Sequence, residues 1–406
     1  MNTQTCDIAI IGGGPVGASL ALALRNSGLN VCVLEARPAN AASNDARALA
    51  LSYGSRLLLE RIGIWKALHD VSSIRSIHVS QRRSLGRALL RAAELKVPEL
   101  GYVLPYPALQ DALDSALEDS GISAVYGASV TRLQGEAENA IIGYQLDGVE
   151  HTLSTRLAVV ADGGKLLAQQ YPPEARDYGQ SALITHITCS APQSPQGGRR
   201  GVPGASGSTL SQADMAYERF TTQGPVALLP FQTGYELVWT APHQLAQEML
   251  AWDDVKFLGE LQCHFGDRVG NFLTVGKRTC FPLDLKRAPH LTPMPHTVLL
   301  GNAAQTMHPV AGQGFNMGLR DAWELAQEIL NAVPETLGTD TMLASYRKQR
   351  RADREAGIRF TDGLVRLFSN DLPLVSAGRA AALSVLDCLP FAKRFVAKRM
   401  MFGTNG

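Results

Sequence analysis

Residues 6–37, CDIAIIGGGPVGASLALALRNSGLNVCVLEAR, contain the pattern that decides the fold. A β-branched run at 8–11 comes before a glycine turn, a helix of small residues is expected from about Pro15 to Gly28, and a second apolar run covers 31–34. A strand, a crossover helix and a second strand in this order form a βαβ unit, whose two strands are parallel. The sequence therefore predicts a doubly wound α/β sheet.

The turn of this unit has the spacing of a dinucleotide-binding motif. Gly12, Gly14 and Gly17 occupy the three positions of G-x-G-x-x-G, and Glu35 ends the second strand. The first glycine makes the tight turn, the second lets a pyrophosphate approach the backbone, and the third lets helix and strand pack closely. Free N–H groups at the helix start bind the anion, and the acid accepts a hydrogen bond from a ribose hydroxyl. The alternative is a purely structural glycine turn.

The motif alone does not select the dinucleotide. NAD, NADP and FAD all present an adenosine diphosphate to it, and Arg37 is of the type that favours a 2′-phosphate. Arg47, in NDARALALS, enters a segment expected to pass near the pyrophosphate, with a surface charge as the equal alternative.

A second region of the chain also has the features of a ligand site. Residues 299–321 read LLGNAAQTMHPVAGQGFNMGLRD, and an apolar run at 297–300 ends at Gly301 and Asn302. The amide of Asn302 can form a hydrogen bond with a polyol chain. An earlier apolar run likewise ends in Ala-Asp-Gly at 161–163, as expected at the ligand-binding edge of a parallel sheet.

A new helix is expected from near Gly314 to Pro334, after a turn at Pro309 and Gly312 that would form a backbone wall. An isoalloxazine ring gains negative charge on reduction, which a helix N-terminus stabilises, whereas nicotinamide has no such need. This region therefore favours FAD over NAD as the bound cofactor. The alternative is a glycine-rich loop that only caps a helix.

The remaining chain predicts a second, sheet-based domain. Stretches such as PVALLPF and YELVWTA alternate at period two, which indicates antiparallel strands. The Pro-, Gly- and Ser-rich segment at 191–208 is expected to be a surface loop, with a lid over a site as the alternative. We expect an α/β fold with a discontinuous Rossmann-like FAD-binding domain (1–70, 100–174 and 290–335), an antiparallel-sheet substrate-binding domain (71–99 and 175–289) and a C-terminal helical segment (336–406).

Composition limits the partners. The 406 residues carry 38 Lys plus Arg against 37 Asp plus Glu, so the net charge of +1 gives no reason to expect a nucleic-acid partner. The six cysteines form no C-x-x-C pair and have no His at metal-ligand spacing, so we expect reduced thiols and no metal site. With no signal-peptide pattern and no apolar run of about 18 residues, a cytoplasmic location is expected.

Three of these segments together resemble the class A flavoprotein aromatic hydroxylases: GGGPVG near the N-terminus, ADG after a strand, and LLGNAAQTMHPVAGQGFNMGLRDA. Within that family, DARALALS, LLPF, YELVWT and GNAAQTMHPVAGQGFNMGLRD are similar to the ubiquinone-biosynthesis hydroxylases, most of all to the 2-polyprenyl-6-methoxyphenol hydroxylase branch.

The resemblance implies a set of FAD-binding residues. It puts Glu35 on the adenosine ribose, Arg47 near the pyrophosphate and Gln110 near the ribityl chain. It puts Val130 by the adenine, and Asn302 on the ribityl chain or phosphate. The complete expected set is Gly12, Gly14, Pro15, Val16, Gly17, Glu35, Ala36, Arg37, Arg47, Gln110, Val130, Ala161, Asp162, Gly163, Gly301, Asn302, Pro309, Gly312, Gln313, Gly314, Phe315, Asn316 and Met317.

Two positions depart from the family pattern. The family usually has Gly-Asp where this chain has Gly301-Asn302, so an acceptor remains but a charge is lost. The Asp-Gly segment usually continues with a Ser and an Arg, whereas ADGGKLLAQQ offers Leu166 and Gln169. The second departure puts in doubt a nicotinamide-docking role for that segment.

The implied reaction is hydride transfer from NAD(P)H to FAD, O₂ addition to the flavin, and hydroxylation of a prenylated phenol in ubiquinone biosynthesis, with other proteins of that pathway as candidate partners. No residue is assigned as catalytic: His308 is the titratable residue of the flavin loop, but a His before Pro is more often structural. Two alternatives stay open. One is a flavin hydroxylase or reductase acting on another aromatic or polyketide-like molecule, and the other is a flavoprotein subunit with little turnover.

The C-terminus, DCLPFAKRFVAKRMMFGTNG, is locally basic. Helical spacing places Phe391, Phe395 and Phe402 on one face, and no acid follows Asp387. One hypothesis is a helix packed on the protein's own core. The other is peripheral contact with the anionic inner membrane, or with a partner that presents the lipid substrate, through Lys393 and the three other basic residues of the tail.

Overall fold

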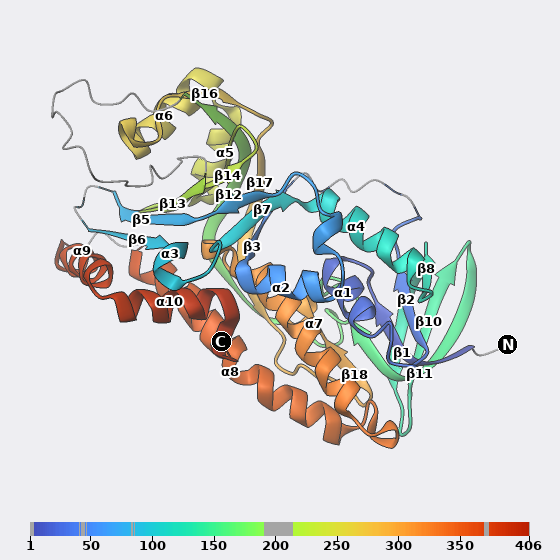
Figure 1. The fold of residues 1–406 in the computed structure, drawn as a ribbon. Coiled ribbons are helices and arrows are strands. Elements are labelled where there is room, and N and C mark those ends of the chain that lie inside the picture. The colour runs from blue at the N-terminus through green and yellow to red at the C-terminus, as the bar shows by residue number, and fades with distance from the viewer. Residues whose placement is uncertain are drawn as a thin grey trace.

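The computed structural model describes residues 4–39, 41, 45, 47–82, 84, 86–190, 214–368 and 373–405 (Figure 1). Its N-terminal part is the βαβ unit that the sequence predicted: β1 (Gln4–Ile11), α1 (Pro15–Ala23) and β2 (Val31–Glu35). The two strands are parallel, with Ile8 opposite Val31. Helix α1 ends before Gly28, because residues 24–30 form a turn.

The first sheet has the strand order β8-β2-β1-β11-β10-β9, and β18 pairs with β11. Its further strands are β8 (Ser123–Tyr126), β9 (Ser129–Gly135), β10 (Ala140–Leu146), β11 (Val149–Val160) and β18 (Thr297–Leu299). Strand β11 runs parallel to both β1 and β18, so the carboxyl ends of β1, β2, β11 and β18 meet at one edge. That edge is followed in the chain by Gly12, Ala36, Ala161 and Gly301.

Three helices pack beside this sheet: α1, α4 (Tyr106–Asp119) and α7 (Gln313–Asn331) (Figure 1). The sequence placed α7 within three residues of these bounds, because Pro334 follows its helical pattern. A smaller sheet, β3 (Ala48–Ser52), β7 (Gly101–Pro105) and β4 (Ser72–Ile74), adjoins α2 (Tyr53–Arg61) and the short helix η1 (Trp65–Ala67).

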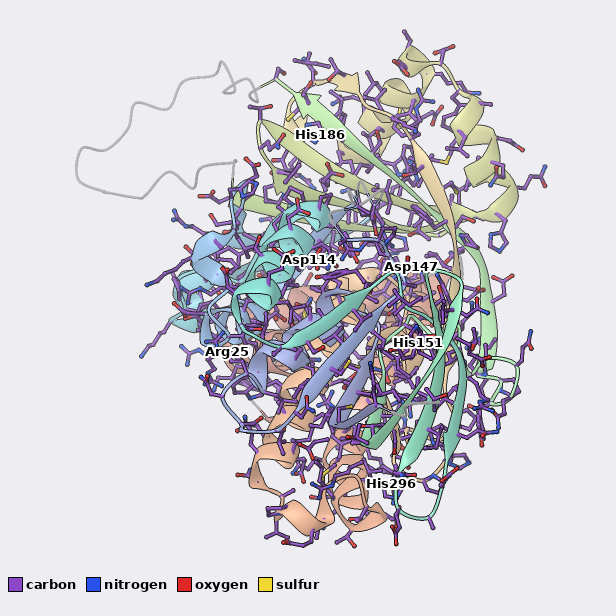
Figure 2. The ribbon with its side chains drawn as sticks, turned by 90° about the vertical axis from the view of Figure 1, so that its right-hand side faces the viewer. Arg25, Asp114, Asp147, His151, His186 and His296 are labelled. Atoms are coloured by element: carbon purple, nitrogen blue, oxygen red, sulfur yellow. The ribbon has the colours of Figure 1, made fainter. Side chains whose placement is uncertain are left out.

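The second large sheet has the order β19-β17-β12-β15-β14-β13-β5-β6, and β16 pairs with β12. Its strands are β5 (Ser76–Gln81), β6 (Arg87–Arg91), β12 (Glu174–Cys189), β13 (Met215–Thr221), β14 (Gly224–Phe231), β15 (Gly234–Pro242), β16 (Phe272–Val275), β17 (Thr279–Arg287) and β19 (Gln305–Thr306). Its pairings are antiparallel except that β13 runs parallel to β5. Figure 2 shows the two large sheets in different halves of the molecule, with His186 of β12 in the upper half and His151 of β11 in the lower half.

One face of the second sheet is covered by α5 (His243–Ala251) and α6 (Asp254–Phe265), two helices that the sequence analysis did not predict. Trp239 of β15 packs on Phe257 and His264 of α6, within a separate buried cluster. Because one face of this sheet is sealed in this way, side chains at alternate positions of the same strands point toward the rest of the molecule.

The C-terminal helices α8 (Asp340–Phe368), α9 (Pro373–Cys388) and α10 (Pro390–Phe402) lie together along one side of the molecule, where α9 packs on β5 and β6 (Figure 1). A buried ionic cluster holds α8 to α7. Arg350 contacts Asp321 at 2.6 Å and Asp353 at 2.9 Å, and Arg320 contacts Asp353 at 3.0 Å.

Short elements complete the chain: α3 (Ala92–Leu95), η3 (Gly266–Val269), η4 (Gly301–Ala303), η5 (Val310–Gly312), η6 (Pro334–Thr336) and η7 (Gly403–Asn405). Among the described residues, no helix is both long and apolar enough to cross a membrane. The expected loop at 191–208 lies outside the described residues, and the exact domain boundaries stay a prediction.

Candidate functional site

A cavity of about 1340 Å³ lies where the carboxyl edge of the first sheet faces the second sheet and the C-terminal helices. Of the expected cofactor-binding residues, all but Gly17 and Met317 line it. Residues from widely separated parts of the chain, between Gly12 and Asn316, were predicted from sequence as one site and lie around one space.

The glycines of the first turn have distinct tasks. A Cβ atom on Gly17 would lie 2.0 Å from the carbonyl oxygen of Gly12, so Gly17 is required by the close packing of α1 on the turn. Gly12 has φ +106°, a conformation that L side chains rarely adopt. A Cβ on Gly14, in contrast, would meet no protein atom within 4 Å and would project into the cavity. The protein's own packing does not require glycine there, whereas a pyrophosphate close to the backbone would.

Two helices begin at the cavity. Gly14 precedes helix α1 and Gly312 precedes helix α7 as the N-cap residue, and neither N-terminus is capped by a side chain. Uncapped N–H groups and the positive end of the helix dipole favour anions. The arrangement therefore suits a long ligand with a pyrophosphate at α1 and a ring that gains negative charge at α7.

Glu35 is fixed in place at the end of β2. Its carboxylate accepts hydrogen bonds from the backbone N–H groups of Gly13 at 2.5 Å and Arg37 at 2.7 Å. Glu35 also lines the cavity, so its remaining lone pairs are available to a ribose hydroxyl. The Arg37 side chain instead forms an ion pair with Asp114 at 2.8 Å, which leaves less of its charge for a 2′-phosphate.

Other expected residues line the middle of the cavity. Gln110 donates to the backbone carbonyl oxygen of Gly13 at 3.0 Å and to the carboxylate of Asp114 at 2.9 Å, so it supports the glycine turn. Arg47 pairs with Asp45, and its guanidinium lies 5.5 Å from the ring of Phe281. An accessible, paired arginine at the cavity wall fits both a pyrophosphate contact and a surface charge.

Asp162 uses its carboxylate on its own loop. It accepts hydrogen bonds from the backbone N–H groups of Gly164, Lys165 and Leu166 at 2.6 to 3.1 Å. Asn302, by contrast, exposes its side chain at the cavity wall. Asn302 is therefore the better placed of the two to bind a polyol chain.

The loop before α7 is held by Asn316. Its amide accepts from the N–H of Ser52 and the hydroxyl of Ser55, and donates to the carbonyl oxygens of Ala50 and Gly312. Asn316 thus fixes the turn at Gly312 against β3. Met317, which the sequence included in the site, is buried instead, with its methyl group against Gly357 of α8.

His308 is buried behind the cavity wall. Burial lowers the pKa of His308 to about 4, so the ring is neutral at physiological pH. Its Nδ1 accepts from the N–H of Val310 at 3.2 Å, and its ring packs edge-on against Tyr178. These contacts fit a structural role better than that of a base.

A large part of the cavity wall was not predicted from the sequence motifs. The second sheet contributes apolar residues such as Ile77, Val79 and Ala227, and the C-terminal helices contribute residues such as Leu364 and Met400. Within the sheet part of this wall stands one carboxylate, Glu218. The period-two alternation of residues along these strands could be read from the sequence, but it does not predict which face of the sheet lines the cavity.

The chain matches the family model described as FAD binding domain over residues 5–194 and 295–361. It is 32% identical to the ubiquinone hydroxylase UbiL of Rhodospirillum rubrum over 98% of this chain and 90% of that protein. It is 30% identical to the 3-demethoxyubiquinol 3-hydroxylase of Escherichia coli, covering 94% of this chain and 97% of that protein.

A solved structure, p-nitrophenol 4-monooxygenase PnpA from Pseudomonas putida, has a similar fold. The TM-score is 0.74 over 97% of both chains, at 15% sequence identity. The likeness therefore extends across both large sheets and the C-terminal helices.

Proposed function

We propose that this chain, which belongs to the FAD binding domain family, hydroxylates the aromatic ring of a polyprenylated phenol in ubiquinone biosynthesis, with NAD(P)H as reductant and O₂ as oxidant. The resemblance to flavoprotein aromatic hydroxylases, the α/β fold class, the cofactor FAD and the enzyme class of FAD-dependent aromatic monooxygenase are confirmed. The substrate and both co-substrates are the part that is proposed, and the names of the two relatives support the substrate class.

The observation that carries the substrate class is the apolar wall of the cavity. On the sheet side it consists mainly of Ile77, Val79, Ala88, Leu90, Ile184, Ala216, Phe220, Ala227, Leu229 and Val238. On the helix side it consists of Phe360, Leu364, Phe368, Leu383, Leu386, Val396, Ala397, Met400 and Met401. Each buried CH₂ group contributes about 0.8 kcal/mol, so this wall suits an isoprenoid chain far better than a small polar phenol.

Bound FAD supplies the redox chemistry, accepting a hydride and activating O₂. The chain's own residues bind and orient it. The N–H groups at the start of α1 would bind its pyrophosphate, Glu35 would accept a hydrogen bond from its ribose, and the start of α7 would stabilise negative charge on its ring. The apolar wall excludes water from the reacting ring, which protects an activated oxygen species from side reactions.

We also propose that α10 contacts an anionic membrane surface. Phe391 and Phe395 are 71% and 65% exposed, and Arg394 and Lys398 are exposed beside them. The opposite side of the same helix contributes Ala397 to the cavity wall. Exposed aromatic rings with neighbouring cations fit a lipid interface, and this one adjoins the wall that a lipid substrate must pass.

One part of the earlier expectation about the tail is wrong. Lys393 is only 8% exposed and pairs with Glu94 at 3.0 Å and Asp387 at 3.4 Å, so it cannot serve a membrane surface. Phe402 packs edge-on against Tyr53 rather than standing with the two exposed rings. The basic face therefore consists of Arg394, Lys398 and Arg399.

Vesicle co-sedimentation tests the membrane contact. Phe391→Ala with Phe395→Ala should abolish binding to vesicles that contain anionic lipid. The matched control, Val255→Ala with Val333→Ala, removes side chains that are 84% and 57% exposed elsewhere and should bind like wild type. Binding by neutral vesicles, or equal binding by both double variants, would argue against this surface; the second result favours a protein partner that presents the substrate.

The function is tested by deleting the gene in its host and identifying the accumulated quinone precursor by mass spectrometry. A polyprenylated phenol that lacks one ring hydroxyl should accumulate, and the purified protein should convert it with consumption of NAD(P)H and O₂. Unchanged ubiquinone in the deletion strain, together with turnover of an unrelated aromatic compound, would overturn the proposal.

A further inference from the structure

Glu218 is a carboxylate on an otherwise apolar surface. It lies in β13, where Ala216, Glu218 and Phe220 alternate and all line the cavity. Its register partners are Val79 on β5 and Ala227 on β14, which also line the cavity. Among the described residues of this sheet that line the cavity, Glu218 is the only acid.

The structure shows no hydrogen-bond or ion-pair partner for this carboxylate among the residues it describes. Loss of solvent raises the pKa of Glu218 to about 7. A carboxylate without a partner in an apolar cavity destabilises the free protein, because its charge is poorly solvated. Such a residue is expected where a ligand supplies the missing polar group.

No other ionisable group compensates Glu218 from the neighbouring strands. On β5 and β14 the cavity-facing neighbours are apolar, and His78 points to the opposite face, where it packs on Tyr217. Arg219, next in the chain, donates to Ser80 at 3.3 Å on that opposite face.

Two titratable groups lie near Phe220, two residues from Glu218. Tyr178 packs on His308 and adjoins the buried cluster that contains Phe220, and the guanidinium of Arg379 lies over the ring of Phe368 in that cluster.

The position of Glu218 along β13 places it beside the flavin loops. Phe220 belongs to a buried cluster with Val310, which lies between Pro309 and Gly312. Ala216, two residues on the other side of Glu218, belongs to a cluster against which Ala48 of β3 packs. Residues 216 to 220 span about 13 Å of extended strand. Glu218 is therefore held between two packing contacts, with Val310 and with Ala48, both of which line the cavity.

We propose that Glu218 is the base that accepts the proton of the substrate's phenol hydroxyl during hydroxylation. This inference rests on the proposed function, which supplies a phenol. In the step, the phenol O–H bond breaks, its electron pair stays on the phenol oxygen, and the proton forms a new O–H bond with the Glu218 carboxylate. The negative charge enters the ring and makes it the stronger nucleophile toward the electrophilic oxygen.

The two pKa values fit partial proton transfer. A free phenol has a pKa of about 10, so it is protonated at neutral pH. A base with a pKa near the working pH is the most effective general base, and such catalysis contributes on the order of a hundredfold or more. Because the carboxylate must be ionised to act, product formation should rise with pH through about 7.

The test compares Glu218→Gln with Glu236→Gln in FAD-loaded protein. Glu236, on β15 of the same sheet, is buried, pairs with His186 and does not line the cavity. With a phenol carrying a short prenyl chain, Glu218→Gln should lower kcat for product on the order of a hundredfold at neutral pH while FAD content is unchanged. The control should keep the wild-type kcat and its rise with pH.

Two further measurements separate a base from a structural role. A ring-fluorinated phenol, which is more acidic, should restore much of the activity of Glu218→Gln, and the rise through pH 7 should disappear in that variant. Equal kcat values for wild type and Glu218→Gln, or an equal loss with both phenols, would overturn the role of Glu218.

The wild type also tests the base if the variant fails to fold, because its kcat should depend only weakly on phenol acidity above pH 7. Wild-type protein that forms no hydroxylated phenol at all would overturn the proposed function itself.

Discussion

Substitution of Gly14 tests cofactor binding, whereas substitution of Gly17 tests the packing of the fold. A side chain at Gly14 would enter open cavity, and the backbone there has φ −63° and ψ 175°, which any L residue adopts. Gly14→Val should therefore leave the stability of the apoprotein unchanged, or raise it by up to about 1 kcal/mol through lower entropy of the unfolded chain. A Cβ at Gly17 would lie 2.0 Å from the Gly12 carbonyl oxygen, so Gly17→Ala must displace backbone and should destabilise the protein.

On FAD binding, Gly14→Val should have the larger effect of the two substitutions. The Gly14→Val side chain occupies the space through which the pyrophosphate reaches the N–H groups of α1. A hydrogen bond to a charged group is worth about 1.5 to 3 kcal/mol, so loss of two such bonds weakens FAD binding by at least about two orders of magnitude. Gly14→Val should be purified as a stable, colourless apoprotein.

FAD titration followed by flavin fluorescence, with thermal unfolding of each apoprotein, measures both effects. Gly259→Ala is the matched control: it lies within α6, a Cβ there meets no atom within 4 Å, and it does not line the cavity. It should bind FAD like wild type. Wild-type FAD affinity in Gly14→Val would refute the placement of the pyrophosphate at α1.

Three further changes test other parts of the structure. Glu35→Gln should weaken FAD binding by about tenfold or more, because a charge-assisted hydrogen bond to the ribose is lost, and an unchanged affinity in the same titration would place the ribose elsewhere. Asn302→Asp should keep an FAD affinity close to wild type, since an acceptor of the same shape remains; a large loss would show that the amide N–H₂ is the group used. Asp353→Asn should lower the free energy of unfolding by about 3 kcal/mol or more, because it removes the carboxylate charge that pairs with Arg320 and with buried Arg350 and leaves Asp321 as the one acid beside Arg350. Burial alone would raise the pKa of Asp353, but Arg320 and Arg350 outweigh it and hold the pKa below its usual value, so this stability is present at neutral pH and lost as pH falls below about 4; denaturant unfolding of the variant should show no such loss.

The cofactor half of the site could be predicted because its signals are local. The turn at Gly12 and Gly14, the acid at the end of β2 and the start of α7 each follow from a few adjacent residues. Parallel strands then bring their carboxyl ends together without any need to know the rest of the fold. The limit of such reasoning is visible at Met317, which shares the motif with Asn316 but points to α8, because a helix turns by about 100° per residue.

The substrate half could not be predicted in the same way because it depends on pairings between distant segments. Strand β13 runs parallel to β5, so Glu218 lies opposite Val79, far away in sequence. The sequence around Glu218 does not predict the register between β13 and β5, and a shift of that register by one residue would turn the carboxylate to the opposite face of the sheet. A single acid in a strand is usually solvent-exposed, and only the enclosure by β5, β14 and the C-terminal helices makes this one chemically significant.

Helix α10 is a second case in which the sequence pattern predicts a shared face but not its environment. Its spacing indicates that Phe391 and Phe395 share a face, but periodicity does not say whether that face meets the core or the surroundings. The contacts of Lys393 answer this question: its ion pairs with Asp387 and Glu94 hold Lys393 inward and leave the two rings outside. Burying a charge and exposing two aromatic rings is unfavourable for a free protein in water, which is the physical argument for a lipid surface against this helix. Because Ala397 and Met401 of the same helix line the cavity, a membrane bound there would lie next to the apolar wall that receives the prenyl chain.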